Sequence, residues 1–118
     1  MTSYDEDRIQ KQIVAELRAR LPKAIIHHSP NEGNRGGTKG IIDGQRRKAM
    51  GMHKGFPDLE VICNGKVTFI EVKTPKGKLA PSQKLFMEEV QAQGFDYLLM
   101  RSADEVRPAL DILRGRAA

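Results

Sequence analysis

The fold is decided by residues 59–73, which read LEVICNGKVTFIEVK. Two mostly apolar runs, residues 59–63 and 67–73, flank Asn64-Gly65 in this stretch. An Asn-Gly pair between two such runs is the strongest short-range signal for a β-hairpin, because both residues accept the positive φ of a tight turn. The sequence therefore predicts two adjacent antiparallel strands.

Three charged residues border this hairpin. Asp58 begins the first strand and Glu71 and Lys73 end the second, so a turn at Asn64-Gly65 returns the chain toward Asp58. Side chains alternate along a strand, which places Glu71 and Lys73 on the same face. Charges among apolar residues need an ion pair or a bound cation. The three residues are therefore either a plain ion-pair cluster or a site for a hard divalent cation such as Mg²⁺.

Ahead of the hairpin the pattern predicts a helix, a strand and a glycine-rich segment. Apolar residues recur at helical spacing over residues 5–21 after an acidic start, and the short run at 24–28 is typical of a strand. The segment 29–55 is rich in glycine and basic residues, with a short helix expected over 45–50 and ending at Gly51. We expect a mobile basic loop at 33–55 that acts as a binding arm, and a merely disordered insertion is the alternative.

Behind the hairpin the pattern predicts a helix, a strand and a final helix. Residues 83–93 carry apolar side chains at helical spacing before Gly94, and residues 95–100 indicate a further strand. The run from Ser102 to Glu105 has the form of a capping box, and Pro108 predicts a kink or a restart of the final helix near Arg107. Together the elements favour one α/β domain over residues 1–118.

The composition fits a single domain with a polyanionic partner. The 118 residues include 20 Lys and Arg against 15 Asp and Glu, a formal net charge of +5, which favours nucleic acid without establishing it. The chain has a single cysteine, no secretory signal, and no apolar run near the ~20 residues that span a bilayer. We therefore expect a cytoplasmic or nucleoid-associated protein that is not secreted and has no membrane role.

Two other kinds of site are disfavoured by residue spacing. His27, His28 and His53 lack a paired Cys/His pattern, and neighbouring strand residues point to opposite faces, which argues against zinc. The glycines of residues 33–40 superficially resemble a phosphate loop, but the motif's Gly-Lys followed by Ser or Thr is missing. Neither a zinc site nor a nucleotide hydrolase is expected.

The residues around the hairpin resemble a known nuclease signature. Pro57-Asp58 followed by Glu71-Val72-Lys73 is similar to the PD-(D/E)XK motif. The chain also resembles the VRR-NUC branch over nearly its whole length. The residues that carry this wider likeness are 30–33, the GFPDL run at 55–59, Gln83, Tyr97 and Arg101-Ser102. The resemblance implies a restriction-endonuclease-like αβββαβ core, with a mixed central sheet flanked by helices. It also implies a divalent metal held by Asp58, Glu71 and the Val72 carbonyl, with Lys73 as the catalytic lysine.

Two further residues are expected at the site. Glu16 falls within the apolar arc of the first helix, and the resemblance to nucleases with an acidic residue there implies a metal-site or water-positioning group. An ion pair with Arg20 is the alternative. Gln83 reaches inward from the start of its helix, and the resemblance implies that it lines the active site. A simple polar residue at a helix start is the alternative.

Basic residues gather in the glycine-rich segment and after the second hairpin strand. We expect them to neutralise DNA phosphates without reading bases, and a solvated basic loop is the alternative. The candidate nucleic-acid-binding residues are Arg35, Lys39, Arg46, Arg47, Lys48, Lys54 and Lys76.

The expected activity is hydrolysis of DNA phosphodiester bonds with Mg²⁺ or Mn²⁺ as cofactor. The resemblance favours branched DNA, such as four-way (Holliday) junctions or flaps, and the lack of a recognition domain disfavours a sequence-specific restriction-like endonuclease. A homodimer is expected because symmetric branched DNA presents two equivalent strands, with Ile41 and Ile42 as candidate contacts. A non-catalytic nucleic-acid-binding module is the alternative from another class.

Overall fold

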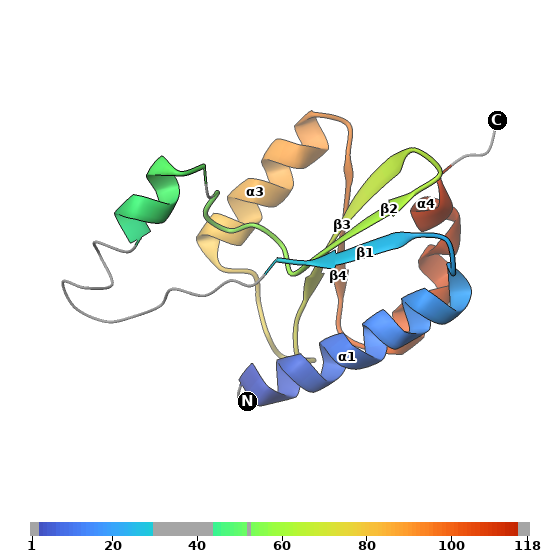
Figure 1. Ribbon diagram of the computed structural model, residues 1–118. Helices are drawn as coiled ribbons and strands as arrows, with labels where there is room; N and C mark the ends of the chain where they lie inside the picture. The colour runs from blue at the N-terminus through green and yellow to red at the C-terminus, as the bar shows by residue number, and fades with distance from the viewer. Residues whose placement is uncertain (1–2, 30–43, 52, 116–118) are drawn as a thin grey trace.

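The computed structural model describes residues 3–29, 44–51 and 53–115, and its elements follow the predicted order (Figure 1). They are α1 (Ser3–Arg20), β1 (Ile25–His28), β2 (Leu59–Cys63), β3 (Lys66–Val72), α3 (Pro81–Ala92), β4 (Asp96–Met100) and α4 (Leu110–Arg114). The predicted αβββαβ core is confirmed, and α4 follows it. Within these ranges, no helix is long and apolar enough to span a membrane.

The four strands form one mixed sheet in the order β1-β2-β3-β4. β2 pairs antiparallel with both β1 and β3, whereas β3 and β4 run parallel because α3 carries the chain back between them. The hairpin turns at Asn64 and Gly65, whose φ angles of 52° and 77° are those of a tight two-residue turn. The hairpin prediction is confirmed.

Helices cover both faces of the sheet (Figure 1). α1 buries its apolar stripe on one face, where Ile13 and Leu17 are completely inaccessible to solvent. α3 packs on the other face over an aromatic cluster of Phe69, Phe86 and Tyr97. The second half of β3 is therefore buried on both sides. A charged side chain in this part of the strand is shielded from water.

The chain after β4 differs from the predicted capped helix. Residues 103–105 and 107–109 form two 3₁₀ turns, and Ser102 makes no side-chain cap. The Glu105 carboxylate instead accepts a 2.7 Å hydrogen bond from the Arg101 backbone N–H. The capping-box prediction is wrong because Glu105 bonds to the end of β4, whereas the restart predicted near Arg107 is observed.

The described part of the glycine-rich segment contains the predicted short helix, at residues 44–49. Met50 N–H donates to the carbonyls of Arg46 and Arg47, and Gly51 follows at a φ of 102°. The residues 30–33 of the family likeness, and Arg35, Lys39, Ile41 and Ile42, lie outside the described residues.

Candidate active site

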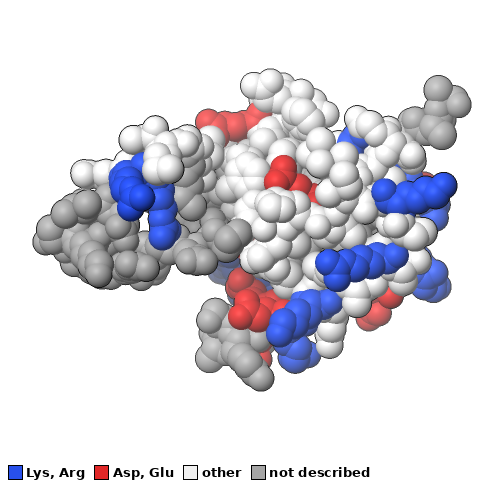
Figure 2. Space-filling model, in the orientation of Figure 1, with Lys and Arg blue, Asp and Glu red and all other residues white. Residues whose placement is uncertain are grey.

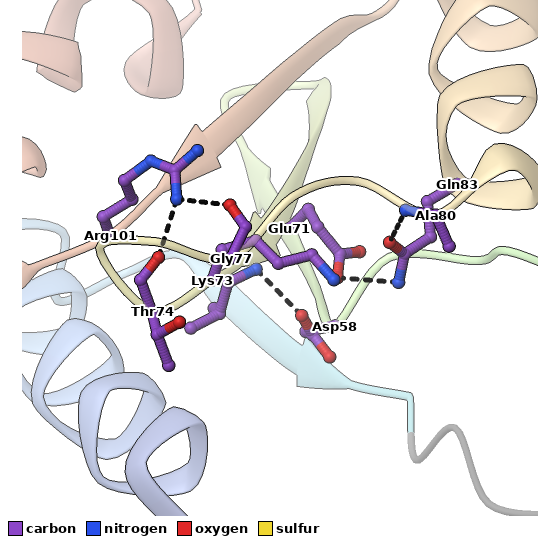
Figure 3. Close-up of polar contacts among 9 residues, drawn as sticks. Asp58, Glu71, Lys73, Thr74, Gly77, Ala80, Gln83 and Arg101 are labelled. Atoms are coloured by element: carbon purple, nitrogen blue, oxygen red, sulfur yellow. Dashed lines mark hydrogen bonds and ion pairs between the residues drawn. The ribbon is translucent and has the colours of Figure 1, made fainter. Parts of the chain in front are cut away.

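Asp58 lies where the GFPDL run enters β2. Its Oδ2 accepts a 2.8 Å hydrogen bond from the Val72 backbone N–H, across the hairpin. Its backbone carbonyl accepts a 3.1 Å hydrogen bond from Ser29 N–H and lies 2.9 Å from His28 Nδ1. Asp58 is therefore tied to β1 through its backbone and to β3 through its side chain, which fixes the carboxylate beside the end of β3 (Figure 3).

Glu71 and Lys73 are buried at the end of β3, with exposed fractions of 1% and 9%. Lys73 Nζ lies 3.6 Å from Glu71 Oε2, and the Gln83 side-chain amide donates to the same oxygen over 3.2 Å. The other oxygen, Glu71 Oε1, is buried and has no hydrogen-bond partner among the described residues. The structure brings Asp58, Glu71 and Lys73 together as the hairpin geometry predicts (Figure 3).

Gln83 is oriented by the first turn of α3. Its Oε1 accepts a 2.8 Å hydrogen bond from the Ala80 backbone N–H, which directs Nε2 toward Glu71. Gly55 packs against the same turn so closely that a Cβ there would overlap the Ser82 carbonyl. The GFPDL run therefore packs against the backbone of the turn from which the Gln83 side chain extends.

The electrostatics of the carboxyl pair favour a bound cation. Burial raises the pKa of Glu71 to about 9, the neighbouring Asp58 carboxyl adds to the rise, and Lys73 opposes it. The two carboxyls are close enough to share a hydrogen bond when one is protonated. Ionising both in this environment is costly unless a cation compensates the charge. The residues therefore fit a hard divalent ion that takes oxygen ligands.

The side chains alone do not complete a metal coordination shell. Within the described ranges, no group of three or more His, Cys, Asp or Glu side chains is arranged to hold a metal ion. Mg²⁺ commonly binds through one or two carboxylates and takes its other ligands from water and phosphate. The Asp58 and Glu71 pair, with the Val72 carbonyl expected from the family likeness, matches that mode of binding.

Glu6 on α1 is influenced by the charges of the site, whereas Glu16 pairs with Arg20. Burial raises the pKa of Glu6, Lys73 lowers it and Asp58 raises it further, so this carboxyl lies in the field of both residues. Glu16 instead accepts a 2.8 Å hydrogen bond from Arg20, as in the alternative interpretation. At about 100° per residue, Glu6 lies between Ile13 and Leu17 in the apolar arc of α1, whereas Glu16 lies about 20° beyond Ile9, at the edge of that arc and about 15 Å from Glu6 along the helix. The helical spacing therefore favours Glu6, but an acid in the first turn is also explained by the helix dipole, so the sequence analysis did not select it.

The loop after Lys73 is held in place from β4. Arg101 Nη1 donates to the carbonyls of Thr74 and Gly77, at 2.6 Å each (Figure 3). It also donates to the Pro75 carbonyl at 3.3 Å. Three carbonyls converging on one guanidinium define the path of the chain directly behind the lysine. The sequence pointed to Arg101 through the family likeness, but not to this role.

The described candidate DNA-binding residues lie at two places. The short helix and the chain leading to Gly55 carry one group, visible as blue side chains in Figure 2, and the loop after β3 carries the other. The exposed members are Arg46, Lys48, Lys54 and Lys76. Arg47 is half-buried on the same helix.

The fold and the site define a nuclease-type α/β domain, in which a hairpin presents two carboxylates and a lysine. The model of the VRR-NUC domain matches residues 2–104, and the chain belongs to that family. A solved VRR-NUC domain protein aligns with a TM-score of 0.71 and 22% identity over 92% of this chain and 87% of its own. A second VRR-NUC domain structure aligns with a TM-score of 0.62 and 23% identity over 91% and 95%. At such identities the structures support the fold, and a search of curated proteins finds no match.

Proposed function

We propose that the protein is a Mg²⁺- or Mn²⁺-dependent endonuclease that hydrolyses phosphodiester bonds in DNA. The observation that carries this proposal is the buried Glu71 carboxyl, which lies beside Asp58, has one oxygen without a partner among the described residues, and has a pKa raised to about 9. A buried carboxyl next to a half-buried one is costly to the fold unless the pair binds a cation. Membership of a nuclease-type family supplies the reaction class.

The metal-holding residues of the proposal are Asp58, Glu71 and the Val72 carbonyl. Gln83 holds one Glu71 oxygen by its amide, and Glu6 adds negative charge from α1. We assign no metal role to Glu16, because it pairs with Arg20. A divalent ion at this place supplies Lewis-acid polarisation of the phosphate and lowers the pKa of a nearby water.

Lys73 is the proposed catalytic group of the chain. Its ammonium is buried and lies 3.6 Å from a Glu71 oxygen, so its position is fixed before the substrate arrives. In the proposed mechanism it donates a hydrogen bond to the attacking water, orients that water in line with the scissile bond, and neutralises charge that develops on the phosphate oxygens.

The basic groups around the site support binding through the DNA backbone rather than through bases. We therefore propose selectivity for DNA structure, with four-way junctions or flaps as substrates, and a homodimer that places two sites on two strands. Mixed dimers with one Glu71→Ala subunit test the dimer: they should nick a junction once where wild-type protein cuts twice. A monomer that makes both cuts at high dilution would contradict the dimer.

The activity is tested with labelled branched, duplex and single-stranded DNA, each incubated with Mg²⁺ or with EDTA. We expect cleavage of branched DNA in Mg²⁺ and none in EDTA. DNA binding without any metal-dependent product would favour a non-catalytic binding module instead. Products cut at one base sequence, whatever the DNA structure, would favour a restriction-like endonuclease.

A further inference from the structure

Tyr97 is a buried polar residue that the proposed mechanism does not use. It lies on β4 and is 7% exposed, and its hydroxyl oxygen has no hydrogen-bond partner among the described residues. Native structures retain few buried hydroxyls without a partner, because each one loses its hydrogen bonds to water. The position of this hydroxyl therefore calls for an explanation.

The sheet places Tyr97 beside Glu71. In the parallel pairing of β3 and β4, Phe69 lies opposite Tyr97, and Glu71 lies opposite Leu99. Residues that are paired, or two positions apart, share a face of the sheet. Tyr97 and Glu71 are therefore diagonal neighbours on the face that α3 covers, a separation that a tyrosine side chain can bridge.

Packing and charge agree with this placement. The Tyr97 ring lies against Phe86, with 6.4 Å between ring centroids. Phe86 lies one helical turn after Gln83 on α3. Burial raises the pKa of Tyr97, and the charges of Glu71 and then Asp58 raise it further. The hydroxyl therefore lies in the field of the same carboxylates and keeps its proton at neutral pH.

We infer that Tyr97 is a positioning residue whose hydroxyl, in the cation-bound protein, donates a hydrogen bond through one water to Glu71 Oε1 and so orients this carboxylate toward the cation. The inference rests on the proposed function. Both atoms are buried, neither has a partner among the described residues, and they are complementary as donor and acceptor, so one bridging water would satisfy both. Gln83 and Lys73 already contact the other oxygen, Oε2. Oε1 has two lone pairs, so it can accept this bond and still face a metal.

The test compares Tyr97→Phe with Thr68→Val. Thr68 carries another buried hydroxyl on β3 with no partner among the described residues, but it alternates with Phe69 and so lies on the opposite face of the sheet. Each change removes one oxygen and keeps the shape of the side chain. We expect Mn²⁺ affinity, measured by calorimetry, to fall about 10-fold in Tyr97→Phe and to stay unchanged in Thr68→Val, because groups that orient a metal ligand contribute factors of about 10 to 100.

Thermal unfolding without metal separates positioning from a structural role. If the Tyr97 hydroxyl acts only when the metal is bound, the melting temperature of metal-free Tyr97→Phe is the same as that of wild type or higher. The same is expected for Thr68→Val. A Tyr97→Phe protein that binds Mn²⁺ as tightly as wild type overturns this inference alone, whatever its melting temperature. Wild-type protein that binds no Mn²⁺ overturns the proposed function, and the inference with it.

Discussion

Glu71 is the residue at which function and stability conflict. It is 1% exposed, and its strand neighbours Ile70 and Val72 are fully buried in the core against α1. A neutral side chain of similar shape at this position would stabilise the fold, because it removes a buried acid whose charged form is penalised. The carboxyl is therefore best explained by what it binds.

The first prediction concerns pH and follows from this carboxyl. The pKa of Glu71 is about 9 in the folded protein against 4.5 for the free group, so between these values the folded state keeps a proton that the unfolded state has released. The stability linked to this proton is fully present below about pH 4.5 and is lost as the pH rises to about 9. In EDTA, we expect the melting temperature to fall by at least about 4 °C between about pH 5.5 and about pH 8.5.

Glu71→Gln is the matched control for this measurement, because it keeps the shape and cannot titrate. Its melting temperature should vary less over the same pH range, and Mg²⁺ should reduce the fall for wild type but not for the variant. A wild-type curve that superimposes on that of Glu71→Gln in EDTA is incompatible with the raised pKa.

The second prediction concerns Lys73. Lys73→Ala should reduce the single-turnover rate of DNA cleavage by about 100-fold or more, the usual contribution of a group that acts on the proton or charge of a reacting atom. DNA affinity, measured by fluorescence anisotropy, should change by less than about threefold, because the variant removes the cation beside one phosphate at most. Lys78→Ala, an exposed change in the neighbouring loop, is the control. A folded Lys73→Ala protein with wild-type turnover would contradict the mechanism.

At the scale of elements, the site is built where the GFPDL run meets α3. Gly55 has a φ of 81° and touches the first turn of α3, which holds Gln83 against Glu71. Phe56 continues this contact by packing its ring against Phe86, with 5.0 Å between centroids. The run therefore places Asp58 and at the same time fixes the helix that supports the second carboxylate.

The third prediction compares Gly55→Ala with Gly65→Ala. Both glycines have positive φ, 81° and 77°, so each change costs about 1 kcal/mol in backbone strain. A Cβ at Gly55 would overlap the backbone of α3, whereas nothing lies within 4 Å of a Cβ at Gly65. We expect Gly55→Ala to lower the melting temperature further and to reduce cleavage at least about tenfold, because a shift of about 1 Å at the site has effects of this order. Equal cleavage by the two variants would show that this contact does not support the site.

The elements that the sequence predicts well are those specified by neighbouring residues. The hairpin follows from Asn64-Gly65 and its flanking runs, and strand alternation then places Glu71 and Lys73 together. The turns after β4 and the choice of Glu6 over Glu16 depend on which of several competing partners each acid takes in the folded chain. Glu105 bonds to Arg101 rather than to its own helix start, Glu16 pairs with Arg20, and the charges of Lys73 and Asp58 act on the pKa of Glu6. Local patterns do not contain this information.

At the scale of the whole molecule, the net charge of +5 is concentrated partly on the short helix at residues 44–49. This helix and α3 lie at one end of the domain, and α4 lies at the other (Figure 1). DNA that enters the site can thus contact the short helix without contacting α4.

The fourth prediction concerns salt. Replacing Arg46, Arg47 and Lys48 by alanine should flatten the dependence of DNA affinity on salt by up to about 0.9 logarithmic units for each phosphate that the variant no longer neutralises. Removal of the same number of charges at the other end of the domain is the control, using Lys23, Arg107 and Arg114. An unchanged slope for the first variant, or an equal change for the control, would place the DNA-binding surface elsewhere.

The central claim, that Asp58, Glu71 and Lys73 form a metal-dependent nuclease centre, is tested most directly by single-turnover cleavage of end-labelled junction and duplex DNA. Wild-type protein and Glu71→Ala are compared in Mg²⁺, in Ca²⁺ and in EDTA, with DNA binding measured in parallel. We predict products only for wild type in Mg²⁺, with binding but little cleavage in Ca²⁺, whose looser coordination activates water less well. Cleavage by wild type in EDTA, or by Glu71→Ala in Mg²⁺ at the wild-type rate, would contradict the account.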